Sequence, residues 1–153
     1  MNWASKLPNF QLIIIGDGPE RKIVEVECRR NPWCHYVGVK KGYEKALYLS
    51  VADILLNPGG VGLGILDSFV SGVPMITTKC GLHGPEIAYL RPNKNGLLTE
   101  NTLADFVSET INLLSNGDWY KNVALSARKD SRRYTINNMT HNFSDGIKKA
   151  LTL

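Results

Sequence analysis

A glycine-rich turn carries the clearest chemistry in the sequence, and it reads Asn57-Pro58-Gly59-Gly60-Val61-Gly62-Leu63-Gly64. Four glycines within six residues cost backbone entropy that an ordinary turn does not require. Without Cβ atoms they let a ligand reach the backbone, and a helix that begins at Leu63 offers its first N–H groups and positive dipole end to an anion. The turn therefore predicts a phosphate or diphosphate site, bordered by Gly59 and formed by Gly60, Val61, Gly62 and Leu63.

Two common phosphate motifs do not match this turn. Gly62 and Gly64 lack a third glycine at the dinucleotide spacing, because Asp67 stands there, and no Lys-Ser or Lys-Thr pair closes a P-loop. Asp67 falls near the first turn of the predicted helix, where its carboxylate can accept hydrogen bonds from ribose hydroxyls. Its alternative role is to interact with the helix dipole, an effect of about 0.3–1 kcal/mol.

The elements that position this turn alternate between short apolar strands and helices. Parallel pairing is expected, because each helix supplies the crossover that a parallel neighbour needs. The sequence thus predicts an α/β fold, a Rossmann-like three-layer αβα arrangement with a mainly parallel sheet, as a single domain over residues 1–153. The expected strands are Phe10–Ile15, Cys34–Val37, Asp53–Asn57 and Pro74–Thr77, and the expected helices are Pro19–Arg30, Tyr43–Val51, Leu63–Ser71, Thr102–Ser115, Asp118–Arg133 (capped by Asp118) and Asn137–Leu151.

Most glycines lie at the edge of the sheet where ligands are expected. Ligands of open parallel sheets bind beyond the carboxyl ends of the strands. For a single position such as Gly16 or Gly38, the glycine's tolerance of positive φ is the alternative explanation. Ten of the fourteen glycines follow the four expected strands: Gly16, Gly18, Gly38, Gly42, Gly59, Gly60, Gly62, Gly64, Gly81 and Gly84.

Composition excludes several classes of protein. The longest apolar run, Leu12–Ile15, is far shorter than the roughly 20 residues that span a bilayer, and no apolar signal core opens the chain. The three cysteines are odd in number and contain no C-x-x-C pair, which argues against a disulfide framework and against a structural zinc site. The expected location is the cytoplasm, and the alternative is the inner face of the membrane.

Positive charge gathers at the end of the chain. Residues Trp119–Leu153 hold seven basic and two acidic side chains, while the whole chain has a net charge of +4. A solvated helical face is the ordinary explanation, and peripheral contact with an anionic membrane is the alternative. Nucleic acid is not an expected partner.

Four segments in order resemble the carboxy-terminal domain of family 4 glycosyltransferases of the GT-B fold. In that family, a segment of type E-G-F-G-x-x-x-x-E-A-x-x-x-G-x-P precedes a buried strand, and the spacing fits this sequence from Gly60 onward. The resemblance runs from about Phe10 to the end and implies one half of a GT-B fold. Its segments are Gly16-Asp17-Gly18-Pro19-Glu20, Ala52-Asp53-Ile54, Pro58–Pro74, and Gly84-Pro85-Glu86-Ile87 with Asn95-Gly96.

The resemblance implies roles for individual residues. Val61, Gly62 and Leu63 would present amides to the diphosphate of a nucleotide-sugar donor, linked to UDP or GDP, and Asp67 would bind the ribose in place of a glutamate. The nucleobase would meet the backbone of Gly38, Val39 and Lys40. Glu86 would face a sugar or ribose hydroxyl, unless it only opens a helix, and no metal, cofactor or catalytic side chain is implied. The cleft would be lined by Gly16, Asp17, Gly18, Pro19, Gly59, His83 and Glu86.

Two departures from the family pattern bear on mechanism. Gly59 stands where the family has the first glutamate of its carboxylate pair, and nothing before Phe10 resembles the family's basic Arg and Lys pair. We therefore expect the donor half of a retaining hexosyltransferase of polysaccharide or glycolipid synthesis, inactive alone, without its first element and its amino-terminal acceptor domain. A non-catalytic nucleotide-binding module and a sugar-nucleotide epimerase half are the alternatives.

Overall fold

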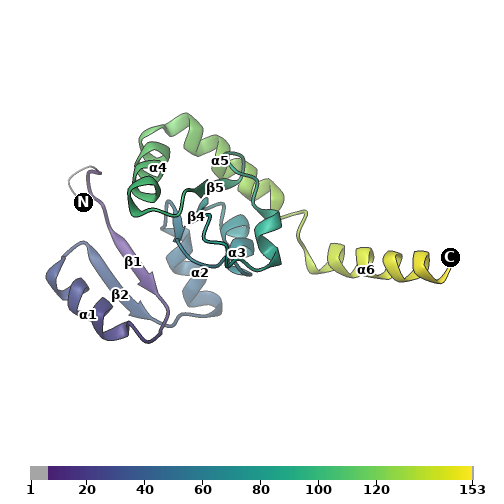
Figure 1. Cartoon of the computed structure of the whole chain (residues 1–153), viewed down its shortest axis with the longest axis horizontal. Coiled ribbons are helices and arrows are strands. Elements are labelled where there is room, and N and C mark those ends of the chain that lie inside the picture. Colours follow the sequence, from purple (N-terminus) through teal and green to yellow (C-terminus); the bar gives the residue numbers. More distant parts are fainter. Residues whose placement is uncertain (1–6, 153) are drawn as a thin grey trace. The chain divides into compact units, whose positions relative to one another are not determined.

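The computed structural model describes residues 7–152, and the chain divides into two compact units between Val51 and Ala52. Both units combine helices with strands, and every strand pair is parallel (Figure 1). The predicted α/β class is therefore confirmed. The strands form a two-stranded sheet in the first unit and a three-stranded sheet in the second.

The first unit is a β-α-β motif followed by a helix. The β-branched run forms β1 (Leu12–Ile15), which pairs with β2 (Cys34–Gly38) in the register Leu12 to Cys34. The register shifts at Ile15, which pairs with Gly38. Helix α1 (Arg21–Arg30) packs on β2, and α2 (Gly42–Ser50) follows.

The second unit is built on three parallel strands in the order β3-β4-β5. They are β3 (Leu55–Asn57), β4 (Met75–Thr78), whose four residues are all buried, and β5 (Gly96–Thr99). The sequence patterns predicted β3 and β4 but not β5. The other elements are α3 (Gly64–Ser71), the 3-10 helix η2 (Pro85–Tyr89), α4 (Leu103–Ser115), α5 (Gly117–Asp130) and α6 (Ile136–Leu151).

The core of the second unit anchors the start of α3. Val61, Ile65 and Phe69 recur at every fourth residue and are at most 1% exposed. They pack together with Met75, Leu90 and Ala127, so one apolar cluster joins α3, β4, the segment after η2, and α5. Burial on this scale fixes the turn that leads into α3.

Capping side chains set where the later helices begin. Asn116 caps α5, because its side chain accepts a hydrogen bond from the N–H of Trp119 at 3.0 Å. The prediction that Asp118 caps this helix was therefore wrong, and Asp118 lies in the first turn instead. Thr102 and Thr135 cap α4 and α6 in the same way.

A buried polar cluster holds the segment that carries η2 against α5. The Asn95 side chain is fully buried and accepts a hydrogen bond from the Arg91 N–H at 2.7 Å. Its amide donates to the Tyr89 carbonyl at 3.0 Å and to Asp130 Oδ2 at 2.7 Å. Arg91 also pairs with Asp130. The position of η2 is thus fixed by hydrogen bonds as well as by apolar packing.

Candidate functional site

The glycine-rich turn lies where the fold predicts a ligand, at the carboxyl end of β3 and directly before α3. Pro58, Gly59, Gly60 and Leu63 are exposed, whereas Val61 is buried. The turn is therefore held by one apolar side chain and presents most of its backbone to solvent.

The carbonyl groups of the turn are bonded by neighbouring polar side chains. Thr78 Oγ1 donates to the Pro58 carbonyl at 2.8 Å, and Thr77 Oγ1 donates to the Gly59 carbonyl at 3.4 Å. The Asn57 amide donates to the Gly60 carbonyl, also at 3.4 Å. Three successive carbonyls are thus satisfied, which leaves N–H groups as the turn's available polar groups.

Those N–H groups form a set at the start of α3. The N–H groups of Gly60, Gly62, Leu63 and Gly64 have no acceptor among residues 7–152. The next two N–H groups, of Ile65 and Leu66, donate back to the turn at 3.2 and 3.0 Å. Open donors at the positive end of a helix suit an anion.

Val61 differs from the prediction made for it. Its N–H donates to His83 Nδ1 at 3.1 Å, and its carbonyl accepts from the N–H of Gly84 at 2.9 Å. The Val61 amide is therefore already bonded and is not open to a diphosphate, so this residue anchors the turn instead. The sequence could not show this, because His83 lies 22 positions further along the chain.

His83 hydrogen-bonds to backbone groups through both of its ring nitrogens. Nδ1 accepts from Val61, and Nε2 lies 2.8 Å from the Thr78 carbonyl, to which it must donate. Both ring nitrogens are occupied by backbone groups. His83 is thus a positioning residue that ties the end of β4 to the turn.

Two carboxylates flank the turn. Asp67 is half-buried and lies in the first turn of α3, directly after the glycine-rich turn. Glu86 opens η2 and folds back, since a Cβ at Gly84 would lie 2.4 Å from Glu86 Oε2 and 3.1 Å from the Val61 carbonyl. The structure therefore places both carboxylates that the sequence singled out beside the turn.

Gly60 is required by a close approach of backbone. A Cβ at this position would lie 2.7 Å from the Leu82 carbonyl oxygen, whereas a Cβ at Gly59 or Gly62 would meet no atom within 4 Å. The segment between β4 and η2 therefore packs directly on the turn at Gly60. The openness at Gly59 and Gly62 leaves room for a ligand there.

The remaining predicted residues lie together in the first unit. The N–H of Gly16 donates to the Gly38 carbonyl at 2.9 Å, so the turns after β1 and β2 are adjacent. Asp17 accepts from the N–H of Gly18 at 2.9 Å, which shapes the turn that ends at Pro19. Val39 is exposed, and Lys40 Nζ lies 3.4 Å from Glu44.

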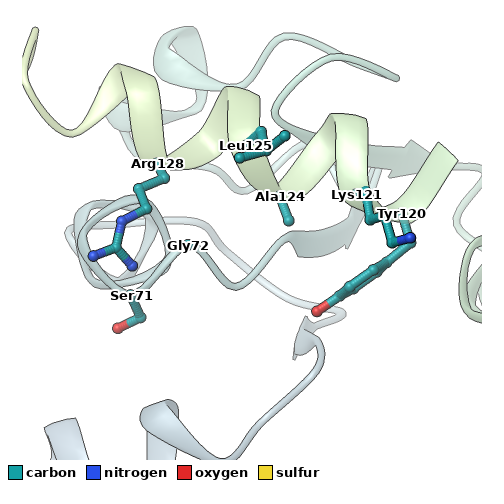
Figure 2. Close-up of a pocket in the computed structure, with 7 residues that line it drawn as sticks. All are labelled: Ser71, Gly72, Tyr120, Lys121, Ala124, Leu125 and Arg128. Carbon is teal, nitrogen blue, oxygen red and sulfur yellow. The ribbon is translucent and has the colours of Figure 1, made fainter. Parts of the chain in front are cut away.

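A cavity of about 330 Å³ lies elsewhere in the second unit, beside the last residues of α3 (Figure 2). Burial, and then the charge of Asp53, raise the pKa of Tyr120 in its wall. The cavity adjoins the carboxyl end of α3, at the opposite end of that helix from the glycine-rich turn. Its lining residues are Ser71, Gly72, Tyr120, Lys121, Ala124, Leu125 and Arg128.

Comparison with known proteins shows the family of this chain. Residues 2–116 match the family described as glycosyl transferases group 1, and the chain belongs to this family. Alpha-monoglucosyldiacylglycerol synthase of Acholeplasma laidlawii is 26% identical over 131 residues, which cover 79% of this chain and 32% of that protein.

Solved structures show the same fold. Sucrose-phosphate synthase of Thermosynechococcus elongatus superimposes with a TM-score of 0.79 at 17% identity, over 98% of this chain and 41% of that one. HepE of Anabaena, solved with UDP, superimposes with a TM-score of 0.74 at 16% identity, over 94% of this chain and 42% of HepE. The fold is that of a GT-B glycosyltransferase carboxy-terminal domain, and the chain spans less than half the length of each of these proteins.

Proposed function

We propose that this chain binds the nucleoside diphosphate of a sugar donor on the open N–H groups of Gly60, Gly62, Leu63 and Gly64. The observation that carries the proposal is this set of four N–H groups, which have no acceptor within the described residues 7–152 and lie at the start of a helix, in a turn whose carbonyls are all occupied. Such a set binds phosphate through several hydrogen bonds at once and through the helix dipole.

The neighbouring groups fit the rest of the donor. Asp67 would accept hydrogen bonds from the ribose hydroxyls, and Glu86 would accept one from the sugar or the ribose. In the first unit, the backbone of Gly38, Val39 and Lys40 would contact the base, with the Gly16–Pro19 turn as the cleft wall. The donor would be a UDP- or GDP-linked hexose, and the protein a retaining family 4 enzyme.

The chain by itself is proposed to bind the donor without transferring sugar. Stabilising the charge that develops on a leaving diphosphate is usually the largest catalytic contribution. The side chains that hydrogen-bond to the turn, within residues 7–152, include no lysine or arginine; they are those of Asn57, Thr77, Thr78 and His83. The basic Arg and Lys pair that the resemblance implies would complete the site, and no side chain of this chain is assigned as catalytic.

Helix α6 supplies the surface through which this domain would meet that partner. Ile136, Met139, Phe143 and Ile147 recur every three or four residues along α6 and are all exposed. An apolar stripe with this spacing is what a surface helix presents to another part of a protein. We propose that the acceptor domain covers this stripe.

Basic residues of the same part of the chain would contact anionic lipid, in keeping with a role in glycolipid or polysaccharide synthesis. No helix within residues 7–152 is long and apolar enough to cross a membrane. We expect the chain to sediment with vesicles that contain anionic lipid. Arg132→Glu with Arg133→Glu should abolish this sedimentation, while Phe143→Ser should leave it unchanged. Equal loss in both variants would contradict the division between lipid-binding charges and a protein-binding stripe.

Thermal unfolding with nucleotides tests the donor assignment. UDP or GDP should raise the melting temperature, and Asp67→Ala should abolish the rise, because hydrogen bonds to a charged group are worth about 1.5–3 kcal/mol, or roughly 10- to 100-fold in affinity. Asp118→Ala is the matched control, since Asp118 also lies in the first turn of a helix. Stabilisation by flavin or adenine nucleotides alone would refute the assignment.

A further inference from the structure

A pair of thiols lies outside the candidate site. Cys28, in the last turn of α1, and Cys34, the first residue of β2, place their sulfur atoms 2.7 Å apart, and both are free thiols. This separation is shorter than ordinary contact between sulfur atoms and longer than the roughly 2.0 Å of a disulfide bond. We propose that Cys28 and Cys34 are an oxidation site that closes reversibly into a disulfide.

The backbone between the two residues already holds the sulfur atoms together. Asn31 receives a hydrogen bond from the Cys34 N–H at 2.9 Å and donates its own N–H to the Cys28 carbonyl at 3.3 Å. Its side-chain amide donates to the Glu27 carbonyl at 2.9 Å. The connection from α1 to β2 is therefore a fixed turn, and the sulfur atoms need to approach by only about 0.7 Å to reach bonding distance.

The two thiols differ in accessibility, which sets the order of the reaction. Cys28 is half-buried, whereas Cys34 is 9% exposed. Burial, followed by the hydrogen bond with Cys28, raises the pKa of Cys34 to about 12, so this thiol is protonated at neutral pH. Cys28 is thus the sulfur that meets an oxidant first, and Cys34 is the resolving thiol.

The oxidant is a small-molecule disulfide. Cys28 loses its proton to water, and its thiolate attacks one of the sulfur atoms of the oxidant, which forms a mixed disulfide on Cys28 and releases one thiolate. Cys34 then loses its proton to water and attacks the Cys28 sulfur, which forms the Cys28–Cys34 bond and releases the second thiolate. Two protein thiols are oxidised by two electrons, and the oxidant is reduced to two thiols.

Closure would tie the end of α1 to the start of β2. Gly38 lies at the other end of β2, next to Gly16, so the bond would form away from the turns proposed to bind the donor. The third cysteine, Cys80, lies beside His83 in the second unit and has no sulfur partner within the described residues. It serves as an internal control.

Incubation of the full chain with oxidised glutathione tests the proposal. Free thiols should fall from three to one, with a loss of about 2 Da and a cross-linked peptide that joins Cys28 to Cys34. The Cys80→Ser variant should still form the Cys28–Cys34 disulfide. The Cys34→Ser variant should accumulate a glutathione adduct on Cys28. The Cys28→Ser variant should form neither this adduct nor the disulfide. Circular dichroism checks that each variant is folded.

Two results would overturn the proposal. One is a native chain that keeps all three thiols in excess oxidised glutathione. The other is a native chain that accumulates a stable glutathione adduct on Cys28 while Cys34 stays reduced. The first would show that Cys28 does not react with the oxidant, and the second would show that the sulfur atoms do not reach bonding distance, whatever the outcome of the nucleotide experiments.

Discussion

Leu63→Pro is expected to weaken binding of UDP or GDP by roughly 10- to 100-fold, because it removes one hydrogen bond to a charged phosphate, worth about 1.5–3 kcal/mol. The backbone of Leu63 has φ −59° and ψ −13°, which proline adopts without strain. The Leu63 N–H has no acceptor within residues 7–152, and its side chain is 68% exposed. The substitution therefore deletes a donor and little else.

Leu63→Ala is the matched control for this experiment. It removes the same exposed side chain but keeps the N–H group, so nucleotide affinity should stay within about twofold of the native chain. Isothermal titration calorimetry measures both variants, and thermal unfolding without nucleotide checks that their stabilities agree. Equal affinities for the proline and alanine variants would show that this amide does not hold the phosphate.

Gly96→Ala is expected to cost about 3 kcal/mol or more of unfolding free energy, at the upper end of overpacking effects. Gly96 begins β5 and pairs with Met75 of β4. A Cβ at this position would lie 2.6 Å from the Met75 carbonyl oxygen and 2.5 Å from Leu90 Cδ1. Leu90 can move its side chain, but the Met75 carbonyl is part of a fully buried strand.

Gly117→Ala provides the comparison. A Cβ at Gly117 would meet no atom within 4 Å, and the residue lies in the first turn of α5, so stability should be unchanged or slightly higher. Urea denaturation of the three proteins measures the difference. A loss of less than about 1 kcal/mol for Gly96→Ala would contradict the close packing of β5 on β4.

The elements with a clear apolar pattern could be predicted from the sequence. The β-branched run before Gly16 and the repeated apolar spacing from Val61 to Phe69 both indicate their structures directly. Strand β5 could not be predicted, because its four residues begin with glycine and become a strand only by pairing with β4. Its stability comes from a neighbour that local patterns do not contain.

In the candidate site, too, features set by local sequence could be predicted, and features that depend on distant residues could not. Residue type and spacing predicted roles for the glycines and for Asp67, whereas the role of Glu86 came from the family resemblance, and all of these roles stay predictions. The bonded amide of Val61 could not be foreseen, since it depends on where a distant imidazole lies. The threonines that end β4 were also missed, because their hydrogen bonds to the turn arise only when the two strands pair.

The most direct measurement is an amide NMR titration of the isotopically labelled chain with UDP and with GDP. We predict that one nucleotide moves the amide resonances of Gly60, Gly62, Leu63 and Gly64 together, in a saturable manner, while that of Val61 moves less because its N–H stays bonded to His83. Shifts confined to the cavity beside Lys121 and Arg128, or no shifts at saturating nucleotide, would contradict a diphosphate site at the glycine-rich turn.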